Sequence, residues 1–456
     1  MMSSLSGKLA QFTLDLKFED IPKEDVWEAK RFLLDSMGCA LAAVNNEDME
    51  HMYRFTEKLG GVPEASMVGR EEKTNAPNAA LMNCLLTRAM DYNDIYWEED
   101  PAHPSDIIGA ALAAAEANKK SGRDALVAIL IAYELTLRWC HAAHPGVREV
   151  GWHHASLIQF VSPFVAGKLY DLDLDQMIAA AGISASSHFT LGGVVAGHLT
   201  NMKNTAAPLA AQAGVVAALM AREGYTGPVE VFEGKEGVFE VITGVEWRPE
   251  WPLKDLGQEF MIRQCAYKAF PTEALTHQPI SAALQVCQAH DLSAEDVAEI
   301  LVETTVRGAD ILSDASKYKP TTKETADHSL PYVIAAAVAD GNVLPSSFSA
   351  EKLKDPRIWD LLGKIKVVAD PEIDAMFPGV KRARVTITTQ SGESHTAQVD
   401  HAKGSPQNRM SDEELVSKFR ANAGEVLDKE GQDRVIDLTW HFEDVEDVGE
   451  YLSLLR

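Results

Sequence analysis

The segment between Asp91 and Asp106 contains the residue types of an acid–base site. Asp91 and Asp94 are followed, after an aromatic and acidic stretch, by His103, a proline and Ser105. The proline holds His103 in an extended backbone, and Ser105 stands at a predicted helix start, whose amide groups favour an anion. The same pattern also fits a solvated acidic loop in which Ser105 only caps a helix. A metal site of Asp91, Asp94 and His103 is a third interpretation, although this spacing matches no standard ligand set.

Other candidate residues stand near the ends of predicted elements. His153 and His154 begin an amphipathic helix, where an imidazole tends to stay neutral and suits a general base, or simply packs. Lys203 precedes an alanine-rich helix with no further charge until Arg222, so it is either a carboxylate anchor or a surface residue at a loop end. Polar residues near the predicted domain junction, each of which also fits a structural role, are Lys268, Glu273, His277, His328 and Tyr332.

The composition restricts the partners of this chain. It carries 68 acidic against 42 basic residues, a net charge of −26, which disfavours nucleic acid and anionic lipid surfaces. A small anionic substrate would therefore need local cations. No apolar run approaches the roughly 18–20 residues of a membrane span, and the first residues do not resemble a signal peptide. Five dispersed cysteines fit a reducing compartment, so we expect a cytoplasmic protein.

Several cofactor chemistries lack their sequence signals. The glycine-rich piece 191–197 has neither the G-x-G-x-x-G spacing nor a preceding strand, which argues against dinucleotide binding. Walker, H-E-x-x-H and G-x-S-x-G patterns are absent from the sequence. The cysteines are too dispersed to suggest an iron–sulfur cluster.

The fold class follows from the hydrophobic pattern. Helical spacing over residues 22–43, 76–91 and 203–222, without strand–helix alternation, predicts a mainly α protein with a large all-helical domain. Residues 383–389 and 394–399 predict a β-hairpin in a smaller α+β domain. The predicted domains are a helical domain at 1–265, an α+β lid domain at 266–400, and C-terminal helices at 401–456 that return to the helical domain.

Read in order, the motifs resemble the MmgE/PrpD family, which includes 2-methylcitrate dehydratase, cis-aconitate decarboxylase and an iminodisuccinate epimerase. The motifs that carry the resemblance are MDYND (90–94), HPSD (103–106), GWHH (151–154), Lys203, KAFPTEALTHQ (268–278), DHSLPY (327–332) and DPRI (355–358). The resemblance implies the two domains above, a homodimer, and catalysis without metal, nicotinamide or iron–sulfur cluster, hence no cofactor.

The resemblance also implies site residues. Those that match family pocket positions are Asp91, His103, His153, Lys203, Lys268 and Tyr332. Glu273 is a carboxylate where the resemblance implies a histidine in the decarboxylases, and this, with the spacing from Asp91 to His103, resembles the dehydratases more closely. Asp94 and Ser105 complete the predicted substrate-binding set. Ile95 stands where the family often has threonine, which is a departure from the family pattern that implies a less polar or different acid as substrate.

The predicted activity is elimination of water from a hydroxy-tricarboxylic acid such as 2-methylcitrate. His153 or His103 would be the base, with Asp91 orienting the imidazole, and Tyr332 the acid or carboxylate donor. Lys203 and Lys268 would bind carboxylates and stabilise the anionic transition state. Decarboxylation of cis-aconitate and epimerisation in the same pocket remain alternatives, as does, more weakly, a non-catalytic acidic helical binding protein.

Overall fold

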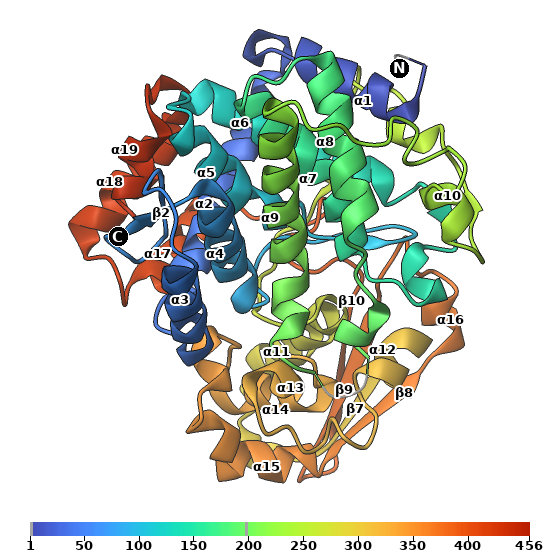
Figure 1. Ribbon diagram of the computed structural model, residues 1–456. Coiled ribbons are helices and arrows are strands. Elements are labelled where there is room, and N and C mark those ends of the chain that lie inside the picture. Colours follow the sequence, from blue (N-terminus) through green and yellow to red (C-terminus); the bar gives the residue numbers. More distant parts are fainter. Residues whose placement is uncertain (1–2, 197–198) are drawn as a thin grey trace.

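The computed structural model describes residues 3–196 and 199–456, so Gly197 of the glycine-rich piece lies outside the described residues. A helical lobe forms the upper part of Figure 1, and α7 and α9 run side by side through its centre. The helices of this lobe are α1 (Leu5–Asp15), α2 (Lys23–Ala43), α3 (Glu47–Leu59), α4 (Ala76–Ala89), α5 (Ile108–Ala117), α6 (Gly122–Trp139), α7 (Ala155–Leu169), α8 (Leu174–Ser187), α9 (Met202–Arg222) and α10 (Val238–Val241).

Small residues explain how closely these helices pack. A Cβ at Gly214 of α9 would meet the Ser162 side chain of α7 at 2.1 Å, and one at Gly109 of α5 would meet the backbone of α4 at 2.5 Å. Short two-stranded pairs link the loops of the lobe. They are β1 (Ala65–Ser66) with β2 (Lys73–Thr74), β3 (Tyr96–Trp97) with β4 (Pro101–Ala102), and β5 (Ala143–His144) with β6 (Glu246–Trp247).

The second lobe, in the lower part of Figure 1, combines a sheet with short helices. Its four strands follow the order β10-β9-β7-β8, in which β7 and β8 are parallel and the other pairs antiparallel. The predicted hairpin is present as β9 and β10. The strands are β7 (Val297–Thr304), β8 (Ile365–Ala369), β9 (Ala383–Thr389) and β10 (Ser394–Val399). The helices are α11 (His277–His290), α12 (Val306–Ile311), α13 (Lys323–Ala326), α14 (Leu330–Asp340), α15 (Pro356–Leu362) and α16 (Pro371–Asp374).

Three C-terminal helices lie against the helical lobe, along the left side of the molecule in Figure 1. They are α17 (Asp412–Ala423), which packs on α2, α18 (Lys429–Trp440) and α19 (Val448–Ser453). Ser411 caps α17 together with Glu414 in the capping box that the sequence indicates.

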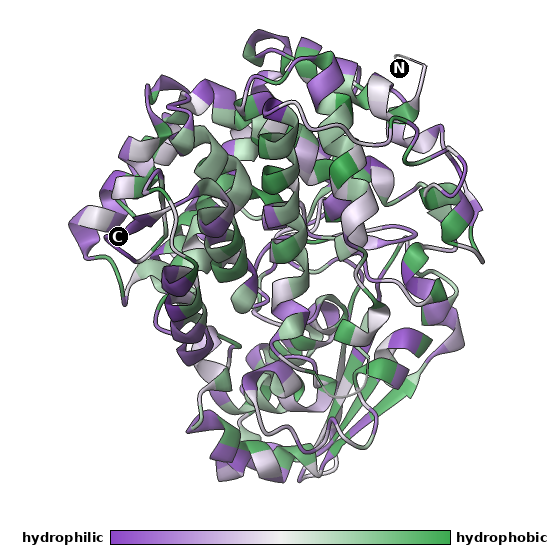
Figure 2. Ribbon diagram, in the orientation of Figure 1, coloured by the Kyte–Doolittle hydropathy of each residue, from purple (hydrophilic) through white to green (hydrophobic). Residues whose placement is uncertain are grey.

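The apolar core falls into two clusters. One takes its residues from Leu5 to Tyr267 and again from Met410 to Leu455, and the other from Trp97 and from Phe270 to Val399. The mainly α fold class is confirmed, whereas the exact domain limits stay a prediction. Figure 2 shows apolar residues along the central helices and the sheet, and polar residues along outer helices such as α3.

Helix α9 is long and apolar enough to span a membrane by length and composition. However, 67% of its apolar window is buried inside the protein, where it packs on α4, α7 and α8. This burial is typical of a core helix, which passes the same test.

Candidate functional site

A cavity of about 140 Å³ lies between the two lobes. The helical lobe contributes the end of α4, the loop after it, the start of α7 and the start of α9. The second lobe contributes the loop around Glu273 and the segments near Leu312 and His328. The polar residues that line the cavity are Arg88, Asp91, His103, Arg148, His153, His154, Lys203, Lys268, Glu273, Lys317 and His328.

Asp91 is held in this wall by an unusual backbone conformation. Its φ of 51° lies in the left-handed region, which aspartate tolerates better than most residues, and it ends α4. This turn directs a buried carboxylate toward two lysines. Oδ1 accepts from Nζ of Lys268 at 2.7 Å, and Oδ2 accepts from Nζ of Lys203 at 2.9 Å.

The charges around Asp91 decide its ionisation. Burial would raise the pKa of this carboxyl, but Lys203, Lys268 and then Arg88 hold the pKa well below its usual range. Arg88 stands one helical turn earlier, with NH1 3.4 Å from Oδ1. Asp91 is therefore an anion that keeps two buried ammonium groups in place.

The two lysines differ in the hydrogen bonds left to them. Lys268 Nζ donates to Asp91 Oδ1, to the Asp91 carbonyl at 3.1 Å and to the Thr272 carbonyl at 2.9 Å, which uses all three of its protons. Lys203 donates only to Asp91 among the described residues. Lys203 thus has protons for a ligand, whereas Lys268 contributes a fixed charge.

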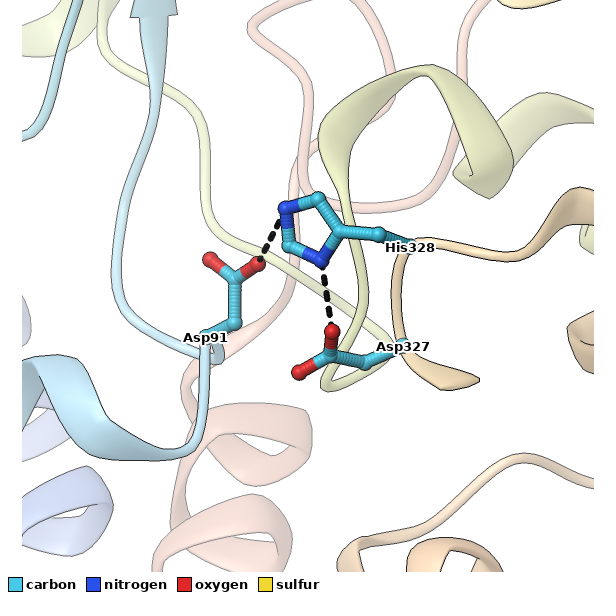
Figure 3. A group of neighbouring side chains, drawn as sticks. All are labelled: Asp91, Asp327 and His328. Atoms are coloured by element: carbon cyan, nitrogen blue, oxygen red, sulfur yellow. Dashed lines mark hydrogen bonds and ion pairs between the residues drawn. The ribbon is translucent and has the colours of Figure 1, made fainter. Parts of the chain in front are cut away.

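His328 faces the same carboxylate from the second lobe (Figure 3). Its Nε2 is 3.7 Å from Asp91 Oδ2, and its Nδ1 is 2.5 Å from Oδ1 of Asp327. Asp327 is fully buried and lies 2.8 Å from Nζ of Lys323. Although burial opposes it, Lys323 and His328 lower the pKa of Asp327 to about 2. The Asp327 carboxylate therefore orients the His328 ring.

Asp91, Asp327 and His328 are close enough together to hold a metal ion. The surrounding cations argue against that use, because Lys203 and Lys268 already bind both Asp91 oxygens and Lys323 lies beside Asp327. A divalent ion would have to displace these ammonium groups. The other combination considered from sequence, Asp91, Asp94 and His103, is not brought together as a ligand set, because Asp94 points into a separate buried network.

His103 is positioned as a base. Its Nδ1 contacts the Asp94 carbonyl, which can only accept, so Nδ1 carries the proton. Nε2 then presents a lone pair to the cavity. Burial, reinforced by Arg88 and Lys268, lowers the pKa of His103 well below its usual range, so the ring is neutral.

His153 has the opposite tautomer. Its Nδ1 accepts from the Ala155 amide at 3.2 Å, so the proton of the neutral ring is on Nε2, which can donate. Burial, followed by Arg88, lowers its pKa to about 3. His154 packs between the two rings, with centroids 3.9 Å from His153 and 5.4 Å from His103. Neither ring nitrogen of His154 has a hydrogen-bond partner among the described residues.

The structure corrects the predicted contact between Asp91 and an imidazole base. Asp91 contacts Lys203, Lys268 and His328, and the Asp94 carbonyl, not Asp91, orients His103. The physical reason is the left-handed turn at Asp91, which places its two carboxylate oxygens against Lys268 and Lys203.

Tyr332 is not part of the cavity wall. Its ring is fully buried in the core of the second lobe, and its hydroxyl donates to the Ser347 carbonyl at 2.7 Å. It lies at the third position of α14, and this position packs against the lobe's own interior. The predicted role as acid or carboxylate donor has no geometric support.

Asp94 and Ser105 also lie outside the cavity wall. Asp94 Oδ1 accepts from Ser105 Oγ at 2.6 Å, and Oδ2 accepts from Tyr133 at 2.6 Å and from the Ser105 amide at 3.1 Å. Burial raises the pKa of Asp94 to about 6, although these hydrogen bonds lower it. The pair fixes the loop that carries His103.

Glu273 lines the cavity as predicted, but its Oε2 accepts from the Leu275 amide at 2.6 Å and caps a short 3-10 helix. Three basic residues of the cavity wall, Arg88, Arg148 and Lys317, were missed from sequence. Arg88 had a signal, because it precedes Asp91 by three positions on a helix. Arg148 had none, because the 3-10 helix that carries it, Val147–Val150, is too short to show a pattern. Its side chain makes no hydrogen bond or ion pair with another described residue.

The cavity is electropositive within an acidic protein. Its wall carries five cationic side chains, Arg88, Arg148, Lys203, Lys268 and Lys317, against the carboxylates Asp91 and Glu273. Burial and then Arg307 lower the pKa of Arg148, which reflects crowding of positive charge. The local cations that an anionic substrate requires are therefore present.

These side chains form a cavity in which neutral imidazoles stand beside several cations, as in an acid–base enzyme. The MmgE/PrpD N-terminal domain model matches residues 7–250 and the MmgE/PrpD C-terminal domain model matches residues 270–444. The chain belongs to the MmgE/PrpD family.

Named relatives have two activities. A cis-aconitate decarboxylase of Mus musculus is 25% identical over 471 residues, covering 100% of this chain and 94% of the relative. One of Aspergillus terreus is 24% identical, covering 100% and 96%. A 2-methylcitrate dehydratase of Cupriavidus necator is 25% identical over 419 residues, covering 86% and 85%. These names support a lyase, and the similar identities do not separate the two activities.

Proposed function

We propose that this protein is a hydro-lyase that eliminates water from a hydroxy-tricarboxylic acid such as 2-methylcitrate. The observation that carries the proposal is the pair of neutral histidines with opposite tautomers in a cavity rich in cations. One imidazole accepts a proton and the other donates one, which is what an elimination of water requires.

In the proposed reaction, Nε2 of His103 removes a proton from the carbon beside a substrate carboxylate. The electron pair of that C–H bond forms the double bond and expels the hydroxyl group on the neighbouring carbon. His153 Nε2–H, or His328 held by Asp327, protonates the departing oxygen so that water leaves. The charge that develops on the carboxylate is stabilised by Lys203 and the fixed charge of Lys268.

Arg148 and Lys203 are the proposed carboxylate anchors. The guanidinium of Arg148 can bind a carboxylate through two parallel hydrogen bonds. Replacing Arg148 by methionine should raise KM at least tenfold, and Arg148→Lys should restore less than half of that loss in free energy, because an ammonium lacks the fork. Unchanged KM in Arg148→Met would remove this residue from the binding set.

Decarboxylation of cis-aconitate is the second candidate, because relatives with that name match the whole chain. It requires protonation at carbon with loss of carbon dioxide, and the same two histidines and cations could serve it. Epimerisation, which needs only removal and return of a proton, is the third.

Proton NMR in deuterated water distinguishes these activities. The protein is incubated separately with 2-methylcitrate, citrate and cis-aconitate. An olefinic product with retention of all carboxylates supports the dehydratase, release of carbon dioxide supports the decarboxylase, and deuterium exchange alone supports an epimerase. Absence of all three with each acid, in a folded sample, would contradict the proposal.

A further inference from the structure

A second cavity of about 160 Å³ lies on the other side of the segment that carries Lys268. Ile95, Trp97, Lys268 and Ala274 line both cavities. The backbone of Ile95 exchanges two 2.9 Å hydrogen bonds with Ala266, and these strands form the partition. The space far exceeds the roughly 10–15 Å³ that one water molecule needs.

The second cavity stands where the chain crosses between the lobes. Residues 264–268 lead from the first core into the second, and residues 400–407 lead back, and both segments line the cavity. The two crossings are joined by a hydrogen bond, in which the Tyr267 amide donates to the Gly404 carbonyl at 2.9 Å. A molecule bound here would therefore contact both lobes at their connection.

Two buried side chains present unused hydrogen-bond acceptors to this cavity. His277 is 4% exposed and Gln278 is 6% exposed, and neither His277 Nε2 nor Gln278 Oε1 has a partner among the described residues. Burial lowers the pKa of His277 to about 3, so the ring is neutral and one of its nitrogens can accept a hydrogen bond. Buried acceptors without donors cost free energy, so a ligand that supplies a donor is favoured.

Two further polar groups of the cavity wall, Lys381 and Ser405, form no ion pair with a described residue. Lys381 Nζ donates only to the Pro378 carbonyl, at 3.3 Å, and forms no ion pair with a described carboxylate. Burial lowers the pKa of this lysine, and the carboxylate of Glu98, which also lines the cavity, partly offsets that effect. Ser405 Oγ is buried without any hydrogen-bond partner among the described residues.

We propose that the second cavity binds a small hydroxy-monocarboxylate, whose carboxylate contacts Lys381 and Ser405 and whose hydroxyl donates to His277 or Gln278. The apolar faces of Trp97 and Pro378 accommodate the short carbon chain. The first cavity, with five cations, suits an acid of higher charge, so the two cavities select different ligands. This site is independent of the reaction proposed above.

The test uses 3-hydroxybutyrate as probe and butyrate as the matched ligand without the hydroxyl. Binding to the whole protein is measured by titration calorimetry and by ligand-observed NMR. We expect saturable binding of 3-hydroxybutyrate that is at least tenfold tighter than that of butyrate. Lys381→Met should weaken binding at least tenfold, and Ser405→Ala several-fold.

Two controls locate the binding. Lys366→Met, an exposed lysine of β8, and Lys203→Met, in the first cavity, should both leave the affinity unchanged. Ser405→Ala keeps the proposal testable if Lys381→Met unfolds, because its hydroxyl makes no described contact. Loss of binding in Lys203→Met, equal affinity for the two probes, or no binding by the folded wild type would each overturn the proposal.

Discussion

Asp91 and Asp94 are two buried aspartates, three positions apart in one loop, and the structure gives them opposite environments. Asp91 lies among ammonium and guanidinium groups, and its pKa is held well below the usual range. Asp94 lies among hydroxyl, thiol and amide donors, and burial raises its pKa to about 6. The comparison shows that neutralising cations, rather than burial, make a carboxylate a permanent anion. Only Asp91 faces the cavity.

The largest expected effect comes from removing a cation that meets the cavity. Lys203→Met should lower kcat/KM by about 10³-fold, because a truncated charge partner costs on the order of 2–5 kcal/mol. Ser105→Ala, which alters only the Asp94 network, should lower it by less than about tenfold. Steady-state kinetics with the substrate identified by NMR measures both. Similar losses in the two variants would show that the networks do not differ in function.

The free energy of unfolding should also depend more strongly on Asp91 than on Asp94. Asp91→Asn leaves Lys203 and Lys268 without their shared carboxylate, which should lower the free energy of unfolding by about 3–5 kcal/mol. Asp94→Asn keeps an acceptor oxygen and should cost about 1–3 kcal/mol. Urea unfolding followed by circular dichroism measures the difference. A larger loss of stability in Asp94→Asn than in Asp91→Asn would contradict the proposed difference between the two aspartates.

The contributions of Asp91 and Asp94 to stability should also depend on pH with opposite signs. Because the pKa of Asp94 is raised, the folded state binds more protons than the unfolded state between about pH 4 and pH 6, and this group's contribution falls by about 3 kcal/mol as pH rises through that window. The contribution of Asp91, whose pKa is lowered, is present above its unfolded pKa of 3.8 and is lost as pH falls further.

The variant Asp94→Asn tests the direction in which the contribution of Asp94 to stability changes with pH. Its stability relative to wild type should improve between about pH 4 and about pH 7, as measured by urea unfolding at both values. His153 acts in the other direction, since its lowered pKa makes stability fall as pH drops below 6.5 toward about 3. A stability difference between Asp94→Asn and wild type that does not change with pH would contradict the raised pKa.

The smallest effect is expected at Ile95, which directly follows Asp94 and lines both cavities. Its apolar side chain favours a substrate that carries a methyl group. Ile95→Thr should therefore shift the ratio of kcat/KM for 2-methylcitrate over citrate by about tenfold toward citrate, since one methylene in a pocket is worth about 1–3 kcal/mol. Competition between the two acids measures the ratio directly. No shift would place Ile95 away from the substrate's methyl group.

Much of the fold could be predicted because it is recorded in local periodicity. The apolar spacing of residues 22–43 and the hairpin at 383–399 determine elements through contacts within a few residues. The parallel pairing of β7 with β8 was not predicted, because Ile300 meets Ile365 only after the intervening helices have packed. A long-range pairing of this kind leaves no local signal in either strand.

The sequence motifs predicted which residues line the candidate site, but not which residues each of them contacts. Asp91, His103, His153, Lys203, Lys268 and Glu273 do line one cavity. Tyr332 was placed wrongly because one face of an apolar helix cannot be distinguished from another in a run that is buried on all sides. Arg148 was missed because the 3-10 helix that carries it, Val147–Val150, is too short to show a periodicity.

The sequence by itself determined the family, the mainly α fold and the order of the chemically active residues, since these depend on residue types and their local spacing. Only the tertiary structure decided which charged groups contact one another. The left-handed turn at Asp91 and the crossing at Lys268 bring Asp91 to cations 112 and 177 positions away, and turn Asp94 into the core. Electrostatic energies depend on separation in space, which the spacing of residues along the chain does not report.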